Sequence, residues 1–304
     1  MASKKITVIG SSNTDMVLKS SHLPAPGETV LGGNFAMKAG GKGANQAVAA
    51  AKLRGDVTFI AKVGNDIFGE QAIANFKDQG IDTRFITKDE TVASGVALIM
   101  VDAQGENSIS VALGANDRLS KDDLNPAIEL LKESSYVLMQ LESPMALVEH
   151  VAMLSQELGF RLVLNPAPAQ QLSNNVLQSL YMLTPNSVEA ELLSGIKVID
   201  EATARKAATK LRETGVEIVI ITMGSKGAYV LSVALDELIP CPKVQAVDTT
   251  AAGDTFNGSL LVALSEGQHL REAIVFANRA AAYSVGILGA QNSAPSREDL
   301  ETII

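Results

Sequence analysis

The stretch YVLMQLESPMALVEHVAMLSQELGFRLVLN, residues 136–165, contains one complete strand–helix–strand pattern. A nearly continuous apolar run at 136–141 is followed by a helical pattern at 145–158, by Gly159, and by a second apolar run at 161–165. Apolar runs without polar alternation are typical of strands that are buried on both faces of a parallel sheet. A glycine directly after a helical pattern fits a helix stop. The stretch therefore predicts two strands of a parallel sheet joined by a helix.

The same alternation continues along most of the chain. Further strands are predicted at 5–10, 57–64, 181–186 and 217–224, and further helices at 43–54, 69–80, 120–133, 186–194, 201–214, 254–266 and 270–285. Gly55, Gly80, Gly195 and Gly215 follow four of these helices and fit helix stops. Regular alternation of this kind predicts a doubly wound, mostly parallel α/β sheet flanked by helices.

Two stretches depart from the alternation. Residues 15–39 are rich in proline and glycine and contain no helical pattern, and residues 94–113 have the pattern of a β-hairpin with the turn DAQGEN. Both favour antiparallel strands. We therefore expect one α/β domain over residues 1–304, with a small antiparallel β lid from about 15–39 and 94–113. Its apolar face would need to be covered by closure over a substrate or by another subunit.

Composition excludes several classes of function. The chain has 304 residues and a net charge of -9, without a cluster of basic residues, which argues against a general nucleic-acid binder. No apolar run approaches the roughly 20 residues that a membrane-spanning helix needs, so we expect no membrane partner and a cytoplasmic protein. The single cysteine, Cys241, excludes an intrachain disulfide. The three histidines lie far apart and have no metal-ligand spacing.

Polar residues recur where the predicted strands end. In an open α/β sheet, ligands bind beyond the carboxyl ends of the strands, so these residues are candidates for a site. For each of them alone, a role as a turn residue or a helix cap is favoured over a functional one, and only their recurrence supports function. They are Asn13, Asp15, Glu142, Asn165, Asn186, Glu189, Thr222, Gly224 and Gly227.

A glycine-rich loop, AGGKGANQAVAAAK at 39–52, leads into an alanine-rich helix. It is not a P-loop, because Lys42 is followed by glycine and the glycine spacing differs. The loop allows a ligand to approach the backbone closely, with Lys42 and Asn45 within reach of hydroxyl groups. A second loop, TMGSKG at 222–227, follows a strand and would direct backbone amides toward a phosphate.

The stretch VDTTAAGDTFNGSLLVAL, residues 247–264, changes from a polar turn into an apolar helix face. The helix is predicted to begin near Gly253 and Asp254, which would leave the N–H groups of Ala251 to Asp254 free to bind an anion. The alternative is that Asp254 is only a helix N-cap and that Asp248 caps a turn.

Two of these segments, GGKGANQAVAAA at 40–51 and VDTTAAGDTFNG at 247–258, resemble the two signature segments of the ribokinase family of sugar and nucleoside kinases. The resemblance runs from Ile6 to about Pro295 and includes SSNTD, PAPGET, MQLESP, NPAPA and TPNSVEAE. It implies ATP-dependent phosphorylation of D-ribose at O5, giving D-ribose 5-phosphate and ADP. It also implies Mg²⁺ bound with ATP, an activating monovalent cation such as K⁺, and a homodimer formed through the β lid.

The resemblance assigns roles to individual residues. Asp254 would be the catalytic base, although the helix dipole should make it less basic and leave orientation of the hydroxyl as its main role. The anion hole would comprise Ala251, Ala252 and Gly253. The sugar-binding residues would be Asn13, Thr14, Asp15, Gly41, Lys42, Gly43, Ala44, Asn45 and Glu142.

The implied nucleotide site comprises Asn186, Glu189, Thr222, Met223, Gly224, Ser225, Lys226, Gly227, Gly253 and Asn278, with Glu189 acting through Mg²⁺. The implied site of the monovalent cation comprises Asp248, Thr250, Ser284, Ile287, Gly289 and Ser293. Two segments depart from the family pattern. LSVALDELIPCP at 231–242 lacks the expected glycine turn, and Ile287-Leu288 stand where some relatives carry basic residues.

Two alternatives remain. One is a kinase of the same family that acts on deoxyribose, fructose, a keto-deoxy acid or a nucleoside, although Asn13 to Asp15, the glycine-rich loop and Glu142 favour a small neutral pentose. The other is a sugar- or nucleotide-binding regulator without catalysis, against which the retained Asp254 and Gly253 argue.

Overall fold

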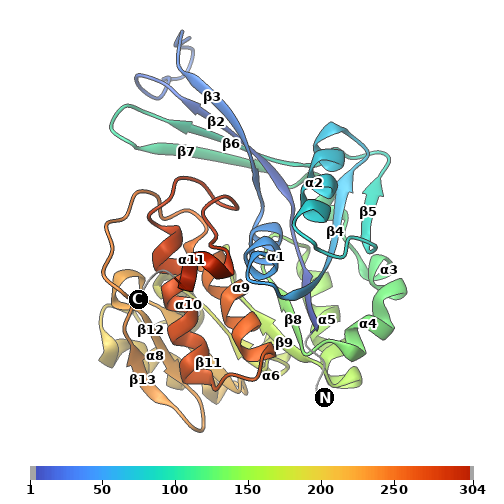
Figure 1. Ribbon diagram of the computed structural model, residues 1–304, viewed down its shortest axis with the longest axis vertical. Coiled ribbons are helices and arrows are strands. Elements are labelled where there is room, and N and C mark those ends of the chain that lie inside the picture. Colours follow the sequence, from blue (N-terminus) through green and yellow to red (C-terminus); the bar gives the residue numbers. More distant parts are fainter. Residues whose placement is uncertain (1–4, 302–304) are drawn as a thin grey trace.

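A computed structural model describes residues 5–301, which form two β-sheets with helices around the larger one (Figure 1). The strands of the larger sheet lie in the order β13 (Asp236–Ile239), β12 (Ala228–Leu231), β11 (Ile218–Thr222), β10 (Met182–Leu183), β9 (Arg161–Leu164), β8 (Tyr136–Met139), β1 (Lys5–Ile9), β4 (Asp56–Gly64) and β5 (Ile86–Asp89). Neighbouring strands from β11 to β5 are parallel, and those from β13 to β11 are antiparallel. This confirms the doubly wound, mostly parallel sheet.

Helices cover both faces of the large sheet. One buried cluster includes side chains of α4, α5, α6, α7 and α8, and the other includes side chains of α1, α2, α9 and α10. The helices are α1 (Lys42–Lys52), α2 (Ile67–Asp78), α3 (Lys121–Leu124), α4 (Ile128–Glu133), α5 (Met145–Leu158), α6 (Asn174–Gln178), α7 (Ser187–Ser194), α8 (Glu201–Glu213), α9 (Ala252–Ser265), α10 (Leu270–Ser284) and α11 (Arg297–Glu301). In the part of the chain from Lys5 to Glu301, no helix is long and apolar enough to cross a membrane.

The strand at 136–139 explains why the apolar runs lack alternation. Val137 and Met139 pack into the cluster on one face of the sheet, and Leu138 packs into the cluster on the other. Because successive side chains of a strand point to opposite faces, a strand between two helical layers must be apolar at every position. Burial of both faces therefore selects the continuous apolar pattern.

Two local predictions need correction, and the missing glycine turn at 231–242 has a structural explanation. The predicted helix at 120–133 is divided into α3, a short 3-10 turn at Asn125–Ala127 and α4, because Pro126 cannot continue the hydrogen-bonding of a helix. The left-handed residue after α1 is Arg54, with φ 66°, and not the expected Gly55. The β12–β13 hairpin forms without a glycine, because the Ser232 hydroxyl accepts hydrogen bonds from the Ala234 and Leu235 amides.

The smaller sheet stands away from the main body (Figure 1). Its order is β3 (Asn34–Gly40), β2 (Asn13–Lys19), β6 (Gly95–Val101) and β7 (Asn107–Ala112), antiparallel except for the parallel β2–β6 pair. Large apolar side chains on it are exposed, among them Phe35 at 60% and Ile109 at 55%. Because β2 follows β1 directly and β3 leads into α1, the base of this sheet adjoins the ends of the main strands.

Candidate active site

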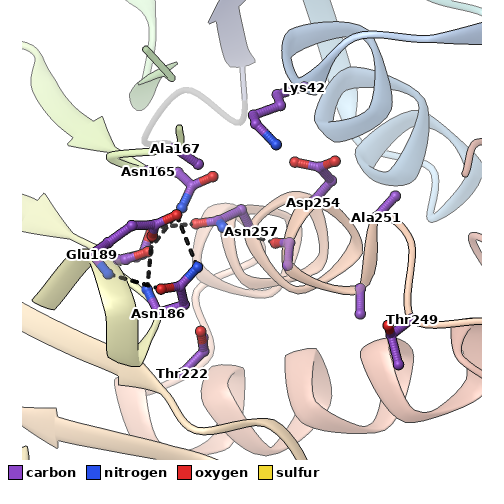
Figure 2. Close-up of a pocket in the computed structure, with 13 residues that line it drawn as sticks. Lys42, Asn165, Ala167, Asn186, Glu189, Thr222, Thr249, Ala251, Asp254 and Asn257 are labelled. Atoms are coloured by element: carbon purple, nitrogen blue, oxygen red, sulfur yellow. Dashed lines mark hydrogen bonds between the residues drawn. The ribbon is translucent and has the colours of Figure 1, made fainter. Parts of the chain in front are cut away.

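A polar pocket of about 170 Å³ lies where the parallel strands end (Figure 2). Asn165 follows β9, Asn186 follows β10 and Thr222 ends β11, so three of the predicted strand-end residues meet in one place. The N-terminus of α9 forms the opposite side. The lining residues are Lys42, Asn165, Ala167, Thr184, Asn186, Glu189, Thr222, Thr249, Ala251, Ala252, Gly253, Asp254 and Asn257.

The N-terminus of α9 lacks a side-chain cap. Its N-cap residue, Ala251, has φ 59°, which is unfavourable for a side chain with a Cβ atom and sharply turns the chain into the helix. The amide of Ala252 donates to the Thr249 carbonyl at 3.3 Å, which removes it from the predicted set of free donors. The amides of Gly253 and Asp254 have no acceptor within residues 5–301. Two unpaired amides at a helix N-terminus can bind an anion.

Asp254 is the third residue of α9 and does not cap it. Its Oδ2 accepts from Asn45 Nδ2 at 3.0 Å and its Oδ1 accepts from Gln46 Nε2 at 2.9 Å, so the carboxylate faces α1. The two helices approach closely at Gly258, where an added Cβ would lie 2.6 Å from the Gln46 carbonyl oxygen. Burial raises the pKa of Asp254, while Lys42, Asn45 and Gln46 oppose the shift. The pKa of Asp254 therefore shifts in the direction opposite to the one that the helix dipole alone would give.

Lys42 is the first residue of α1, where a positive charge opposes the helix dipole. Figure 2 shows its amine directed toward the Asp254 side of the pocket. Burial would lower the pKa of Lys42, but nearby carboxylates, Asp254 and Glu142 foremost, raise it above its ordinary value. The ammonium is therefore held charged by a site that contains several acidic groups.

The other predicted sugar residues lie between the base of the small sheet and Lys42. Glu142 Oε2 accepts from Ser11 Oγ at 2.6 Å and from the Lys42 amide at 3.0 Å, and Asn13 Oδ1 accepts from Asn116 Nδ2 at 2.8 Å. Gly41 has φ 89°, and a Cβ there would lie 2.7 Å from the Asn13 amide. The loop therefore requires glycine for close packing against the residues after β1.

Asp15 differs from its neighbours in this group. Along the described chain no donor forms a hydrogen bond with its carboxylate. Burial, followed by the charge of Glu142, raises the pKa of Asp15 to about 6, against the effects of Lys42 and Lys38. Asp15 is therefore a half-buried carboxylate that lacks a hydrogen-bond donor among the described residues but interacts with the charges of Glu142, Lys42 and Lys38.

Comparisons with known proteins identify the family. A model of the pfkB family carbohydrate kinases matches residues 3–297. The chain belongs to the pfkB family of carbohydrate kinases. It is 45% identical to a ribokinase of Haemophilus influenzae over 97% of each chain, and 38% identical to a deoxyribokinase of Salmonella typhi over 96% of each. A solved structure of Arabidopsis thaliana ribokinase complexed with ribose and ATP superposes with a TM-score of 0.91, at 31% identity and coverage of 99% and 98%.

In this pfkB-family chain, the N-terminus of α7 is capped within the chain. Asn186 Oδ1 accepts from the Val188 and Glu189 amides, each at 2.9 Å. Glu189 in turn accepts from the Asn186 amide at 2.8 Å and from Asn186 Nδ2 at 2.9 Å. Figure 2 shows both side chains on the wall of the pocket away from Lys42. Burial raises the pKa of Glu189, against the hydrogen bond from the Asn186 backbone and the charge of Lys42.

The remaining predicted nucleotide residues do not line this pocket. Residues 223–227 follow Thr222 in the chain but are not part of the pocket lining, and the Lys226 ammonium donates a hydrogen bond to the Ile199 carbonyl. Asn278 is buried in α10 and donates from Nδ2 to the Ile239 carbonyl at 3.0 Å and the Pro240 carbonyl at 3.3 Å. Asn278 therefore fixes the segment after β13 against α10, and its side-chain NH₂ group is occupied within the protein.

Of the predicted cation residues, Asp248 and Gly289 are joined by a hydrogen bond between two distant segments. Asp248 accepts from the Thr250 amide and from the Gly289 amide, each at 2.9 Å. Burial would raise the pKa of Asp248, but the hydrogen bonds from Thr250 and Gly289 lower it below its ordinary value. The hydroxyls of Ser284 and Ser293 donate locally to the Ala281 and Ala290 carbonyls. Ile287 lies between them, and its amide donates to the Ser284 carbonyl at 3.0 Å.

Sequence reasoning missed two features of the site. Lys52, at the end of α1, donates to the carbonyls of Gln291 at 2.8 Å and Ala294 at 3.0 Å and thereby ties α1 to the loop after Gly289. Gln46 and Gln140 are buried and belong to a chain of amide hydrogen bonds that reaches Asp254. The only signal for Gln46 was a polar residue in an alanine-rich helix, and its partners are remote in sequence.

Proposed function

We propose that this chain catalyses the ATP-dependent phosphorylation of D-ribose at O5, giving D-ribose 5-phosphate and ADP. The observation that carries the proposal is the pairing of the buried Asp254 carboxylate with the unpaired Gly253 and Asp254 amides in one pocket. A base beside an anion site is what transfer of a phosphoryl group to a hydroxyl requires. The identity to ribokinases supports ribose as the acceptor and ATP as the donor.

In the reaction, the ribose O5 attacks the terminal phosphorus of ATP, and the bond from that phosphorus to the β-γ bridging oxygen breaks. Asp254 orients the hydroxyl and accepts its proton. The Gly253 and Asp254 amides face the oxygens of the transferred group and stabilise the charge that develops there. One well-placed donor of this kind contributes about 3–4 kcal/mol in comparable oxyanion holes. Lys42, beside Asp254, supplies the nearest positive charge.

Ribose would bind between the glycine-rich loop and the base of the small sheet. Asp15 and Glu142 accept hydrogen bonds from sugar hydroxyls, while Lys42 and Asn45 donate to them. The small sheet acts as a lid whose closure excludes water and so limits hydrolysis of ATP. Its exposed apolar residues, Phe35 and Ile109 among them, would form the contact of a homodimer.

The residues present fit Mg²⁺ as an ion carried by ATP. The described residues 5–301 contain no group of three or more His, Cys, Asp or Glu that could hold a metal by themselves. Mg²⁺ typically binds to phosphates and to one or two carboxylates, often through water. Glu189 has lone pairs beyond those used by Asn186 and would contact the waters of the ion. When bound, Mg²⁺ neutralises charge on the phosphates.

A monovalent cation fits beside Asp248, whose carboxylate retains lone pairs after accepting from Thr250 and Gly289. Such an ion would hold the loop before α9 against the segment at 284–293. We expect turnover to fall when K⁺ is replaced by a large organic cation. An unchanged rate in thoroughly desalted protein would remove the cation from the mechanism.

The function is tested by ADP formation with Mg-ATP across a panel containing ribose, deoxyribose, fructose, a keto-deoxy acid and a nucleoside. We expect ribose to give the highest kcat/KM. Deoxyribose is the second candidate, because a deoxyribokinase is among the relatives. Tight ribose binding without turnover of any sugar would instead identify a sugar-binding regulator.

A further inference from the structure

A continuous chain of buried side-chain amides connects the core of the sheet with Asp254. Gln140, directly after β8, donates from Nε2 to Gln46 Oε1 at 2.5 Å. Gln46 Nε2 donates to Asp254 Oδ1 at 2.9 Å and to Asn165 Oδ1 at 3.0 Å. Asn165 Nδ2 then donates to the Thr184 carbonyl at 2.9 Å. Gln46 and Gln140 are 0% and 1% exposed, so neither amide exchanges these partners for water.

The orientation of every amide in this chain is determined by obligatory acceptors. The Thr184 carbonyl can only accept, so Asn165 must turn its NH₂ toward it and its oxygen toward Gln46. Gln46 must then present its NH₂ to Asn165, and the same NH₂ meets the Asp254 carboxylate, which also only accepts when ionised. The Gln46 oxygen is left facing Gln140, which donates to it. A reversed Gln46 would place its oxygen against two acceptors.

This arrangement determines how the Asp254 carboxylate can act. Gln46 donates to Oδ1 and Asn45 donates to Oδ2, so each oxygen carries one fixed hydrogen bond from α1. Rotation of the carboxylate would break both bonds and leave the fully buried Gln46 amide without this acceptor. Hydrogen bonds from neutral donors also favour the ionised form, against the effect of burial. The lone pairs that remain are those available to a substrate hydroxyl in the pocket.

We propose that Gln46 is the positioning residue of Asp254, and that Gln140 acts through Gln46 by fixing the direction in which its amide points. Gln46 presents a donor to the carboxylate and keeps it oriented and ionised, without touching the substrate. The side chain of Gln140 donates its hydrogen bond to Gln46, and among the described residues no hydrogen bond joins it to Asp254. The proposal deepens the proposed function, because it assumes that Asp254 is the base.

The test compares Gln46→Met, Gln140→Met and the double variant in a pH profile of kcat with ribose and Mg-ATP. Gln46→Met should lower kcat about tenfold and move the acidic limb of the profile up by about one pH unit, the size expected when a hydrogen bond to a carboxylate is lost. Gln140→Met should also lower kcat and move the acidic limb up, but by less, with kcat about threefold lower. In the Gln46→Met background the Gln140 substitution should have no further effect on the limb, because it acts only through Gln46.

A matched control separates positioning from stability. Thr7→Val removes another buried side-chain hydrogen bond, from Thr7 to Ser134 at 2.7 Å, away from the pocket, and should lower thermal stability without moving the limb. If Gln46→Met does not fold, Gln46→Glu retains the size of the side chain and, by placing an acid against Asp254, should move the limb higher still. If the acidic limb of the pH profile does not move in the folded Gln46 variant, the positioning role of Gln46 is overturned. If the Gln140 substitution moves the limb as far in the double variant as it does alone, Gln140 does not act through Gln46. Neither result touches the proposed function, which fails if the original chain forms no ADP from Mg-ATP in the presence of ribose, whereas normal turnover of Asp254→Asn would remove only Asp254 as the base.

Discussion

The N-termini of α7 and α9 face the same pocket and are built in opposite ways. At α7, Asn186 and Glu189 satisfy each other and the first amides of the helix, so the end is closed by the chain itself. At α9, the N-cap is Ala251, and the amides of Gly253 and Asp254 remain without acceptors in the part of the chain that the structure describes. Asp254, which could have served as a cap, faces α1 instead.

The difference indicates which of the two helix N-termini binds a ligand. Unpaired polar groups in a pocket carry a free-energy cost, and such groups persist where function requires them. Gly253 supports this reading, because an added Cβ there would meet nothing within 4 Å and its backbone does not require glycine. A structural reason for glycine is therefore lacking, whereas a ligand that approaches the backbone supplies one. The N-terminus of α7 then only lines the pocket, whereas the N-terminus of α9 is the one that contacts the reacting group.

The largest expected effect is that of Asp254→Asn. The variant keeps the size of the side chain but loses the base, so turnover should fall by about 10²-fold or more while ribose and ATP still bind. ADP formation gives the rate, and calorimetric titration gives the two affinities. Near-normal turnover would show that the open helix end is not the reactive one.

Gly253→Ala tests the open end more finely. Alanine is favoured over glycine inside a helix, so the free energy of unfolding should rise by up to about 1 kcal/mol. The added methyl group would occupy the space above the unpaired amides, and kcat should fall about tenfold, which corresponds to roughly 1.4 kcal/mol of lost stabilisation. Chemical denaturation and steady-state kinetics on the same preparation measure both. Unchanged turnover would mean that nothing approaches these amides.

The sequence was sufficient for the parallel strands β1, β4, β8, β9, β10 and β11 of the large sheet, because a local apolar run specifies each of them. The predicted helix at 145–158 coincides with α5, since Gly159 after it takes the left-handed conformation, with φ 79°. By contrast, β5 was missed, because its four residues, ITKD, are largely polar and pair only at the edge of the sheet. The break at Pro126 was visible in the sequence but was outweighed by the helical pattern around it.

The site was only partly predictable, for a different physical reason. Strand-end residues such as Asn165 and Asn186 could be placed, because parallel strands end at one edge of a sheet. Whether Asp254 caps its helix or faces α1 depends on how closely α1 and α9 pack at Gly258, which no local pattern specifies. The Gln140–Gln46 hydrogen bond likewise joins residues 94 positions apart. Such contacts are determined by tertiary packing.

Asn186→Ala tests the closed end. Because Asn186 caps α7, its loss should lower the free energy of unfolding by about 1–2 kcal/mol. The KM for ATP should rise only severalfold, since Asn186 is largely occupied within the protein. Thermal denaturation and kinetics at varied ATP measure the two effects. Loss of turnover at unchanged stability would reverse the comparison and make α7 the reactive end.

Asp15→Asn extends the comparison to a carboxylate outside any helix, with the smallest expected effect. The pKa of Asp15 is raised from 3.8 to about 6 in the folded protein, so between these values the folded state binds more protons than the unfolded state. Stability contributed by the protonated group is therefore complete below pH 3.8 and is lost as the pH rises through 6. Without ribose, Asp15→Asn should consequently stabilise the protein at pH 8, by about 1 kcal/mol after allowance for partial exposure, and should have little effect below about pH 4.

The same substitution should have the opposite effect on binding. Above pH 6 the Asp15 carboxylate is ionised and can accept hydrogen bonds from sugar hydroxyls, so the KM for ribose in the original chain should rise as the pH falls through that value. In Asp15→Asn the KM should be higher and should not change across this range. Thermal unfolding and the ribose KM between pH 5 and about pH 8 measure both effects, with Thr7→Val as a control for unrelated pH effects. A variant that gains stability and also retains ribose affinity would show that the Asp15 carboxylate does not bind the sugar, and would leave the open N-terminus of α9 as the stronger candidate for ligand binding.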